Sequence, residues 1–287
     1  MDESGGEEMS QEVEFERMPG FHRLESLWRI EYRAVALEPV ITQAASEEAK
    51  TEVSDLIGKT YAKAELDLVP LVMGDKAVLT GNAVKGLFRH IISAQLTAAG
   101  IKVCVQNVKL GEGASRPEER ASQCPPDRPC FVCTWFGTAS RQGALYFSFL
   151  ESTAPLEDIL VDEPIPMIAL SDQHRAAARR AFALIAPVRA GTEFRGWIKG
   201  ENLSEEIIGA IKEVVDMSER GFVQFGALKT RGMGAMRMEI TRIEKYRTVP
   251  RFELEKAWEG DELAEFLRAC QEKYHALLAR GGARAEG

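Results

Sequence analysis

The sequence predicts an α+β protein with a ferredoxin-like core of the order β-α-β-β-α-β, interrupted by inserted loops. Three observations predict it. Residues 27–37 alternate apolar and polar side chains as a strand does, residues 79–100 combine a strand end with an amphipathic helix, and residues 204–217 form a second amphipathic helix. The order of these segments along the chain is the order that this core requires.

The first half of the core begins with the strand 27–37, which places Trp28, Ile30 and Tyr32 on one face. A hairpin follows in residues 66–81, with its turn at Gly74 and Asp75. Its second strand leads into the helix, which Gly100 closes. Residues 42–64 have no steady period, so we expect a long loop or a short helix there.

The second half begins with a polar insertion, after which residues 144–152 predict a strand. Residues 159–170 contain two prolines and predict an edge strand or a protruding hairpin. The helix 204–217 turns five β-branched residues inward and ends at Gly221; these residues are Ile207, Ile208, Ile211, Val214 and Val215. A final helix is predicted for residues 261–280.

The charge of the chain is unevenly distributed. The 287 residues carry a formal net charge of -8, and residues 1–16 contain seven acidic residues and no Lys or Arg. We therefore expect a disordered acidic tail over residues 1–20 and a nearly neutral body. No run of eighteen apolar residues occurs, and the N-terminus is acidic, which predicts a cytoplasmic protein without a membrane partner.

Two basic elements are candidate binding sites for a polyanion. Lys85 and Arg89 are four residues apart and share one face of the predicted helix, near its N-terminus. Residues 225–251 contain seven Lys or Arg and two acidic residues, including Lys229 and Arg231 beside Gly232 and Gly234. An ordinary helix with a solvated basic side is the alternative for the first element.

The architecture also serves RNA-recognition modules, whose sheet and loops hold single-stranded RNA. The segment RGMGAMRM, residues 231–238, echoes the basic-Gly-aromatic-Gly strand of those modules, with methionines in place of the aromatic residues.

Three cysteines crowd into residues 124–133. Cys130 and Cys133 are two residues apart, as in turns that direct two sulfurs at one tetrahedral ion, and Cys124 is close by. Cys104 is the first candidate for a fourth ligand, and His90 is the alternative. We expect a structural zinc site within an insertion of about residues 101–137, against the alternative of scattered free thiols.

Four segments in this order resemble the RAMP superfamily of CRISPR-associated proteins, and within it the backbone subunit of type III or related type IV effector complexes. They are LTGNAVKGLFRH (79–90), CFVCTWFG (130–137), DQHRAAARRAFALIAPVRAGTEFRGWI (172–198) and LKTRGMGAMRMEI (228–240). The resemblance covers residues 27–245. It implies an RRM-like domain over residues 21–250, with a thumb-like segment at about 152–172, followed by a C-terminal helix and tail over residues 251–287.

The resemblance also implies a function. Such a subunit binds guide (CRISPR) RNA together with other RAMP subunits and displays it for pairing with target RNA. Lys85 and Arg89 would contact guide phosphates, Gly232 and Gly234 would approach the RNA closely, and the basic residues Lys229, Arg231, His174 and Arg175 would join them.

Two other functions remain open at this point. Family members can cut target RNA with an aspartate and a divalent ion, and Asp55 is the nearest candidate here for a Mg²⁺-dependent endoribonuclease. Residues 37–56 lack the paired glycines that usually precede this aspartate. The second alternative is a zinc-stabilised protein-interaction module that does not contact RNA.

Overall fold

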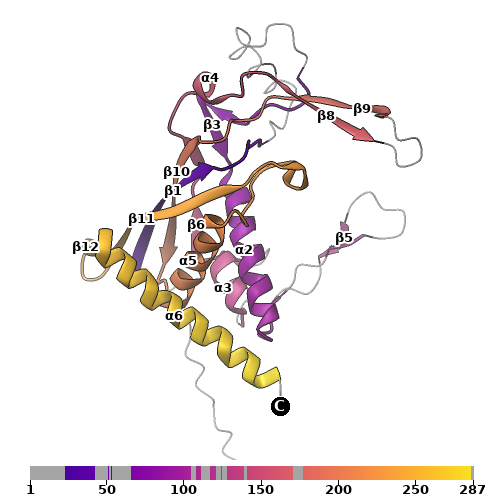
Figure 1. Ribbon diagram of the computed structural model, residues 1–287. Helices are drawn as coiled ribbons and strands as arrows, with labels where there is room; N and C mark the ends of the chain where they lie inside the picture. The colour runs from indigo at the N-terminus through magenta and orange to yellow at the C-terminus, as the bar shows by residue number, and fades with distance from the viewer. Residues whose placement is uncertain are drawn as a thin grey trace, which may run out of the picture.

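The protein has an antiparallel sheet with helices packed against one face (Figure 1). The computed structural model describes residues 23–42, 51, 53, 66–104, 108–110, 117–120, 124, 128–138, 141–170 and 177–285. Strands in the central sheet follow the order β12-β11-β1-β10-β7-β3-β2, and β6 also pairs with β10. These strands are β1 (Ser26–Ala36), β2 (Val72–Met73), β3 (Lys76–Leu79), β6 (Leu145–Phe147), β7 (Leu150–Ser152), β10 (Glu193–Glu201), β11 (Met236–Arg247) and β12 (Glu253–Trp258).

β1 occupies the middle of the sheet, and the predicted alternation of its side chains is confirmed. Trp28, Ile30 and Tyr32 are buried on the helical side. β1 pairs antiparallel with β10 on one side and with β11 on the other. Because β1 is hydrogen-bonded to a strand on each side, a shift of its pairing by one residue would turn its apolar side chains to solvent. The alternation in the sequence therefore specifies the pairing register of β1.

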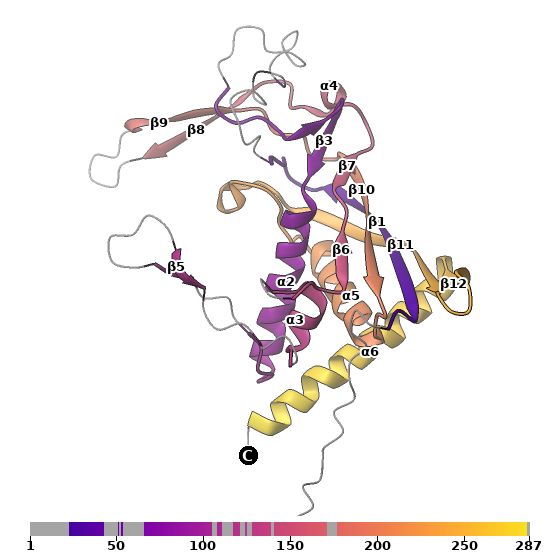
Figure 2. The same ribbon diagram turned by 180° about the vertical axis from the view of Figure 1, so that it is seen from behind.

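The described helices are α2 (Gly81–Ala98), α3 (Phe131–Phe136), α4 (Leu156–Ile159), α5 (Glu205–Glu219) and α6 (Gly260–Ala285). Figure 2 shows α2, α3 and α5 on the same side of the sheet, with α6 running past α5 from the end of β12. The five inward residues predicted for α5 are all buried. Gly209 lets α5 approach α6 closely, because a Cβ there would lie 2.1 Å from the Cys270 carbonyl oxygen.

Three parts of the fold differ from the sequence-based prediction or go beyond it. The strand expected over 144–152 is two strands, β6 and β7, separated at Ser148. Ser148 receives the Trp197 N–H on its Oγ at 2.8 Å and donates its own N–H to the Trp197 carbonyl, so both strands follow β10 across the break. β12 was not predicted. The insertion contains a hairpin of β4 (Val108–Leu110) and β5 (Pro117–Arg120) and the short helix α3.

A second hairpin projects from the body of the protein (Figures 1 and 2). It consists of β8 (Ile165–Leu170) and β9 (Ala177–Ile185), which pair antiparallel. The segment predicted to be thumb-like, about residues 152–172, contains α4 and β8, and the returning strand follows it. Among the described residues, no helix is both long enough and apolar enough to cross a membrane.

Candidate RNA-binding surface and cysteine cluster

The N-terminus of α2 is held tightly against the sheet. Thr80 caps the helix, since its Oγ1 accepts the Ala83 N–H at 3.3 Å. A Cβ at Gly81 would lie 2.3 Å from the Phe147 carbonyl oxygen, so only glycine lets the helix begin this close to β6. The basic side chains of α2 are therefore carried by a rigid element.

The two cations of α2 differ in their surroundings. Arg89 points toward the end of α3, where its Nη1 donates to the Gly137 carbonyl oxygen at 2.8 Å. Its Nη2 is buried and has no hydrogen-bond partner among the described residues. Lys85 is half-buried, and burial together with the charge of Arg89 lowers the pKa of its ammonium group. No carboxylate in the described part of the chain pairs with Lys85, whereas Arg89 also has a structural role.

The glycine loop, residues 226–234, lies beside the segment that follows β1. The Ala227 N–H donates to the Ile41 carbonyl oxygen and the Gly234 N–H to that of Pro39, both at 2.9 Å. Gly226, Gly232 and Gly234 all have positive φ, at +80°, +77° and +92°. The loop backbone therefore adopts positive φ angles at three positions, which glycine tolerates and residues with a Cβ disfavour.

The reason for glycine differs among the three positions of this loop. A Cβ at Gly234 would lie 2.2 Å from the Phe225 carbonyl oxygen, and one at Gly226 would lie 2.2 Å from that of Ile41. The fold itself thus requires glycine at both positions. A Cβ at Gly232 would meet nothing within 4 Å, so only the backbone conformation favours glycine there. Gly232 follows the short 3-10 helix η1 (Lys229–Arg231) and ends it in the left-handed region.

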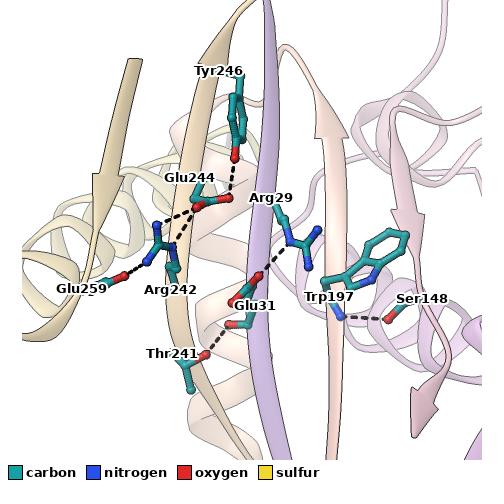
Figure 3. A network of polar contacts seen from close by, with 9 residues as sticks. All are labelled: Arg29, Glu31, Ser148, Trp197, Thr241, Arg242, Glu244, Tyr246 and Glu259. Carbon is teal, nitrogen blue, oxygen red and sulfur yellow. Dashed lines mark hydrogen bonds and ion pairs between the residues drawn. The ribbon is translucent and has the colours of Figure 1, made fainter. Parts of the chain in front are cut away.

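The basic patch predicted over residues 225–251 is smaller in the structure. Four of its seven cations form ion pairs with glutamates; these cations are Arg242, Lys245, Arg247 and Arg251. The pairing of Arg242 with both Glu244 and Glu259 is visible in Figure 3. The other two glutamates, Glu253 and Glu255, belong to β12, which the sequence did not predict. The exposed cations without an ion pair among the described residues are Lys229, Arg231 and Arg237.

The methionines of residues 231–238 do not take the place of stacking aromatic residues. Met233, Met236 and Met238 are all buried. The residues of this part of β11 that face solvent are Arg237, between the last two methionines, and Glu239, after them. The echo of an RNA-recognition strand at this segment is therefore wrong, because its apolar positions belong to the core.

A small apolar cluster joins the glycine loop to the base of the projecting hairpin. Its buried members are Ile41, Ile185 and Met233. Ile185 ends β9, and Ile41 lies just after β1. Three segments far apart in the sequence thus meet at one place. Three predicted site residues, Asp55, His174 and Arg175, lie outside the described residues, and their roles stay predictions.

The four predicted cysteine ligands lie together around the start of α3. The sulfur atoms of Cys104, Cys124 and Cys133 are within 4.8 Å of one another, so this group could hold a metal ion. Cys130 adjoins it, because its Sγ receives the Cys104 N–H at 3.4 Å and its own N–H donates to Cys124 Sγ at 3.3 Å. His90, the alternative ligand, is exposed on α2 and is not part of the group.

The thiols of this cluster have unequal pKa values. Burial raises the pKa of Cys133 and of Cys124. Burial also tends to raise the pKa of Cys130. Hydrogen bonds from the backbone N–H groups of Cys104 and Cys133 outweigh this effect, so the pKa of Cys130 is lowered. Backbone N–H groups directed at sulfur stabilise a thiolate, which is the form that binds metals. The backbone therefore favours the thiolate at Cys130, whereas burial favours the neutral thiol at Cys133 and Cys124.

Comparison with known proteins agrees with this geometry. No curated protein matches the chain significantly. The model of the RAMP superfamily matches residues 51–237, about two thirds of the chain. The matched region contains the basic helix α2, the cysteine cluster, the projecting hairpin and the glycine loop. The chain therefore belongs to the RAMP superfamily, a family of CRISPR-associated RNA-binding proteins.

Proposed function

We propose that the protein is a guide-RNA-binding backbone subunit of a type III or related type IV effector complex. It grips guide RNA phosphates and displays the guide for pairing with target RNA, beside other RAMP subunits. The observation that carries the proposal is that the glycine loop exposes Lys229 and Arg231, and the start of β11 beside it exposes Arg237, all without an ion pair among the described residues. Cations that no carboxylate neutralises are the ones that release counterions from a phosphate backbone.

The fold supports an RRM-like domain over residues 21–250. The central strands follow the order β11-β1-β10-β7, and α2 and α5 provide the two crossover connections. Antiparallel strands in this order with two crossover helices are what a ferredoxin-like core needs. The hairpin of β8 and β9 is suited to the role of a thumb, because it projects beyond the sheet (Figure 1). Residues 1–20, for which we expect the acidic tail, lie outside the described residues, and residues 251–287 contain β12 and α6.

Reversing the charge of the glycine loop tests the proposal. The double variant Lys229→Glu and Arg231→Glu should bind single-stranded RNA at least tenfold more weakly, because two phosphate contacts are replaced by repulsion. The slope of log affinity against log salt should become shallower by roughly 0.7 per lost contact. Fluorescence anisotropy of a labelled RNA between low and moderate salt measures both quantities.

The matched control reverses two cations outside the proposed surface. Arg268 and Arg280 are exposed on α6, and the double variant Arg268→Glu and Arg280→Glu changes the net charge by the same four units. This variant should keep most of the affinity and the salt slope of the wild-type protein. An equal loss in both proteins would show that only overall charge matters, and the glycine loop would have no special role.

Gly86 provides an independent test at α2. It is exposed in the middle of the helix, and a Cβ there would meet nothing within 4 Å. Glycine inside a helix costs about 0.5–1 kcal/mol relative to alanine, and no contact with another described residue requires it. Gly86→Ala should therefore raise the free energy of unfolding by about that amount in urea titrations.

The same variant should weaken RNA binding if RNA lies against α2 beside Lys85. A bound backbone that approaches Gly86 closely would meet the new methyl group. Stabilisation together with unchanged RNA affinity would place the RNA away from this part of the helix.

We also propose that the cysteine cluster holds a structural zinc ion. Three sulfur atoms within 4.8 Å of one another and a fourth, Cys130 Sγ, next to them offer four donors for tetrahedral zinc, which favours thiolates. Backbone N–H groups are directed at the sulfurs of Cys124 and Cys130. When bound, zinc would link Cys104 at the start of the insertion to α3 near its end. Cys130 precedes α3 and Cys133 lies within it, and Gly137 at its end accepts the hydrogen bond from Arg89. The metal site would in this way support the position of α2.

A further inference from the structure

The face of the central sheet that turns away from the helices carries a band of charged and aromatic side chains. Figure 3 shows Arg29, Trp197 and Tyr246 on this face, which we call the open face. Its charged residues are partly exposed; for example, the side chain of Arg195 is 74% exposed and that of Arg33 is 45% exposed. No described helix packs on β1 from this side.

Aromatic side chains recur across the open face. Trp197 lies on β10, Tyr246 on β11 and Tyr146 on β6. In the strand register, Trp197 is opposite Glu31 and Tyr246 is opposite Leu27, both on β1. Tyr146 is opposite Lys199 on β10. Tyr246 stacks on Phe252 with ring centroids 5.0 Å apart, and Phe252 is 64% exposed. Strand spacing and rise place Trp197 and Tyr246 roughly 16 Å apart, a distance that a few nucleotides span.

Cations lie between these rings. The Lys199 ammonium is 4.3 Å and the Arg29 guanidinium 5.8 Å from the centre of the Trp197 ring. The backbone of Trp197 makes two hydrogen bonds with Ser148, one of which is drawn in Figure 3, so the indole projects from a fixed strand. Arg195, Gly196 and Trp197 also resemble the basic-Gly-aromatic beginning of an RNA-recognition strand, with Trp where that strand has Phe or Tyr.

The open face as a whole is nearly neutral. Its outward cations on β1, β10 and β11 are Arg29, Arg33, Arg195, Lys199, Arg237 and Arg242, and its outward acids are Glu31, Glu193, Glu201, Glu239 and Glu244. Six cations and five acids leave a charge of about +1, and most of the cations are already paired with glutamate. Long-range attraction of phosphate is therefore small here, and aromatic stacking is the main interaction that this face offers.

We propose that the open face is a second nucleic-acid site, which binds single-stranded RNA by stacking bases on Trp197 and Tyr246. The proposal rests on the RNA-binding function proposed above and adds to it a contact that holds bases, where the glycine loop and α2 hold phosphates. Stacking is tolerant of sequence, because every base has a π-face. Binding at this face should depend only weakly on salt, unlike binding at the glycine loop.

Tryptophan fluorescence gives a direct test, because the other three tryptophans are shielded. Trp28, Trp135 and Trp258 are only 7%, 5% and 7% exposed, so a base that stacks on the protein surface quenches chiefly Trp197. A hexanucleotide of uridine or adenosine added to the full chain should quench the emission. Trp197→Ala should abolish the quenching and weaken binding of the hexanucleotide about tenfold, and Trp197→Phe should restore most of the affinity.

The control variant is Phe222→Ala, which removes an aromatic side chain that is 72% exposed, just after α5 and away from the open face. It should leave both quenching and affinity unchanged. Thermal melting of each variant shows that the proteins compared are folded. Tyr246→Ala should also weaken hexanucleotide binding while the signal of Trp197 is kept, so the test does not depend on one substitution.

The outcomes separate this proposal from the one on the glycine loop. Quenching by the hexanucleotide that persists in the Lys229→Glu and Arg231→Glu protein supports an independent open-face site. If these glutamates abolish RNA binding while Trp197→Ala and Tyr246→Ala change nothing, the glycine loop stands and the open-face proposal is wrong. The proposal is also wrong if Trp197→Ala alters the oligomeric state but not the hexanucleotide affinity, because the face would then be a protein interface.

Discussion

Replacing Cys130 with serine is expected to remove the metal from the protein and to lower its stability strongly. Metal analysis of wild-type protein should find about one zinc per chain, and the Cys130→Ser protein should contain only a small fraction of it. Loss of a structural metal is among the largest single-site effects, and we expect a loss of roughly 4 kcal/mol in the free energy of unfolding or more. The physical reason is that folding gathers the thiolates from segments that are separate in the unfolded chain.

Two other variants make this experiment specific. Cys270 is buried in α6 outside the cluster, and Cys270→Ser should keep the zinc content. His90→Ala should keep it as well, since His90 is not part of the sulfur group. Zinc lost on His90→Ala but retained in Cys104→Ser would assign the fourth ligand to the histidine. Native protein without any metal would refute the zinc site altogether.

Replacing Gly234 with alanine is expected to have the second-largest effect. A left-handed backbone costs a residue with a Cβ about 1–2 kcal/mol, and the new atom would lie 2.2 Å from the Phe225 carbonyl oxygen. Relief of such a contact requires a backbone shift, which costs about 1–3 kcal/mol more. We expect a loss of roughly 3 kcal/mol in the free energy of unfolding, measured by urea titration, and weaker RNA binding because Lys229 and Arg231 are displaced.

Gly232→Ala is the matched control for this prediction. Gly232 has a similar positive φ of +77°, but its Cβ would enter open space. Its substitution should cost only the conformational term of about 1–2 kcal/mol. If both variants lose equal stability, the close approach of Gly234 to Phe225 is not what makes glycine necessary. If Gly232→Ala is the variant that loses more RNA affinity, the RNA itself lies close to Gly232.

Several elements were predictable from the sequence because their signals are local. The alternation of Trp28, Ile30 and Tyr32 predicts β1, and the inward residues of α5 follow helical spacing. Gly100 and Gly221 end their helices with positive φ, as glycine at a helix end predicts. The spacing of Cys124, Cys130 and Cys133 predicts a cluster, and the structure brings Cys104 to it from a distant segment.

Other features depend on which segments meet, and no local pattern reveals that. β12 has a weak strand signal because its edge position leaves Leu254 and Lys256 exposed. The break at Ser148 exists because its hydroxyl bonds to the Trp197 N–H on a neighbouring strand. Arg89 had the sequence pattern of a phosphate ligand, yet its guanidinium donates to Gly137, 48 residues away in the chain.

The sequence by itself determined the α+β class, the central strand, the two crossover helices and the cysteine cluster, because side-chain periodicity and short-range spacing are properties of neighbouring residues. Only the tertiary structure decided which cations are available to RNA. Ion pairing with the glutamates of β11 and β12 neutralises most of residues 225–251, while Lys229, Arg231 and Arg237 lack an ion pair within the described chain. Charge counted along the chain cannot show this, because Coulomb interactions depend on distances in space, which the strand pairing sets.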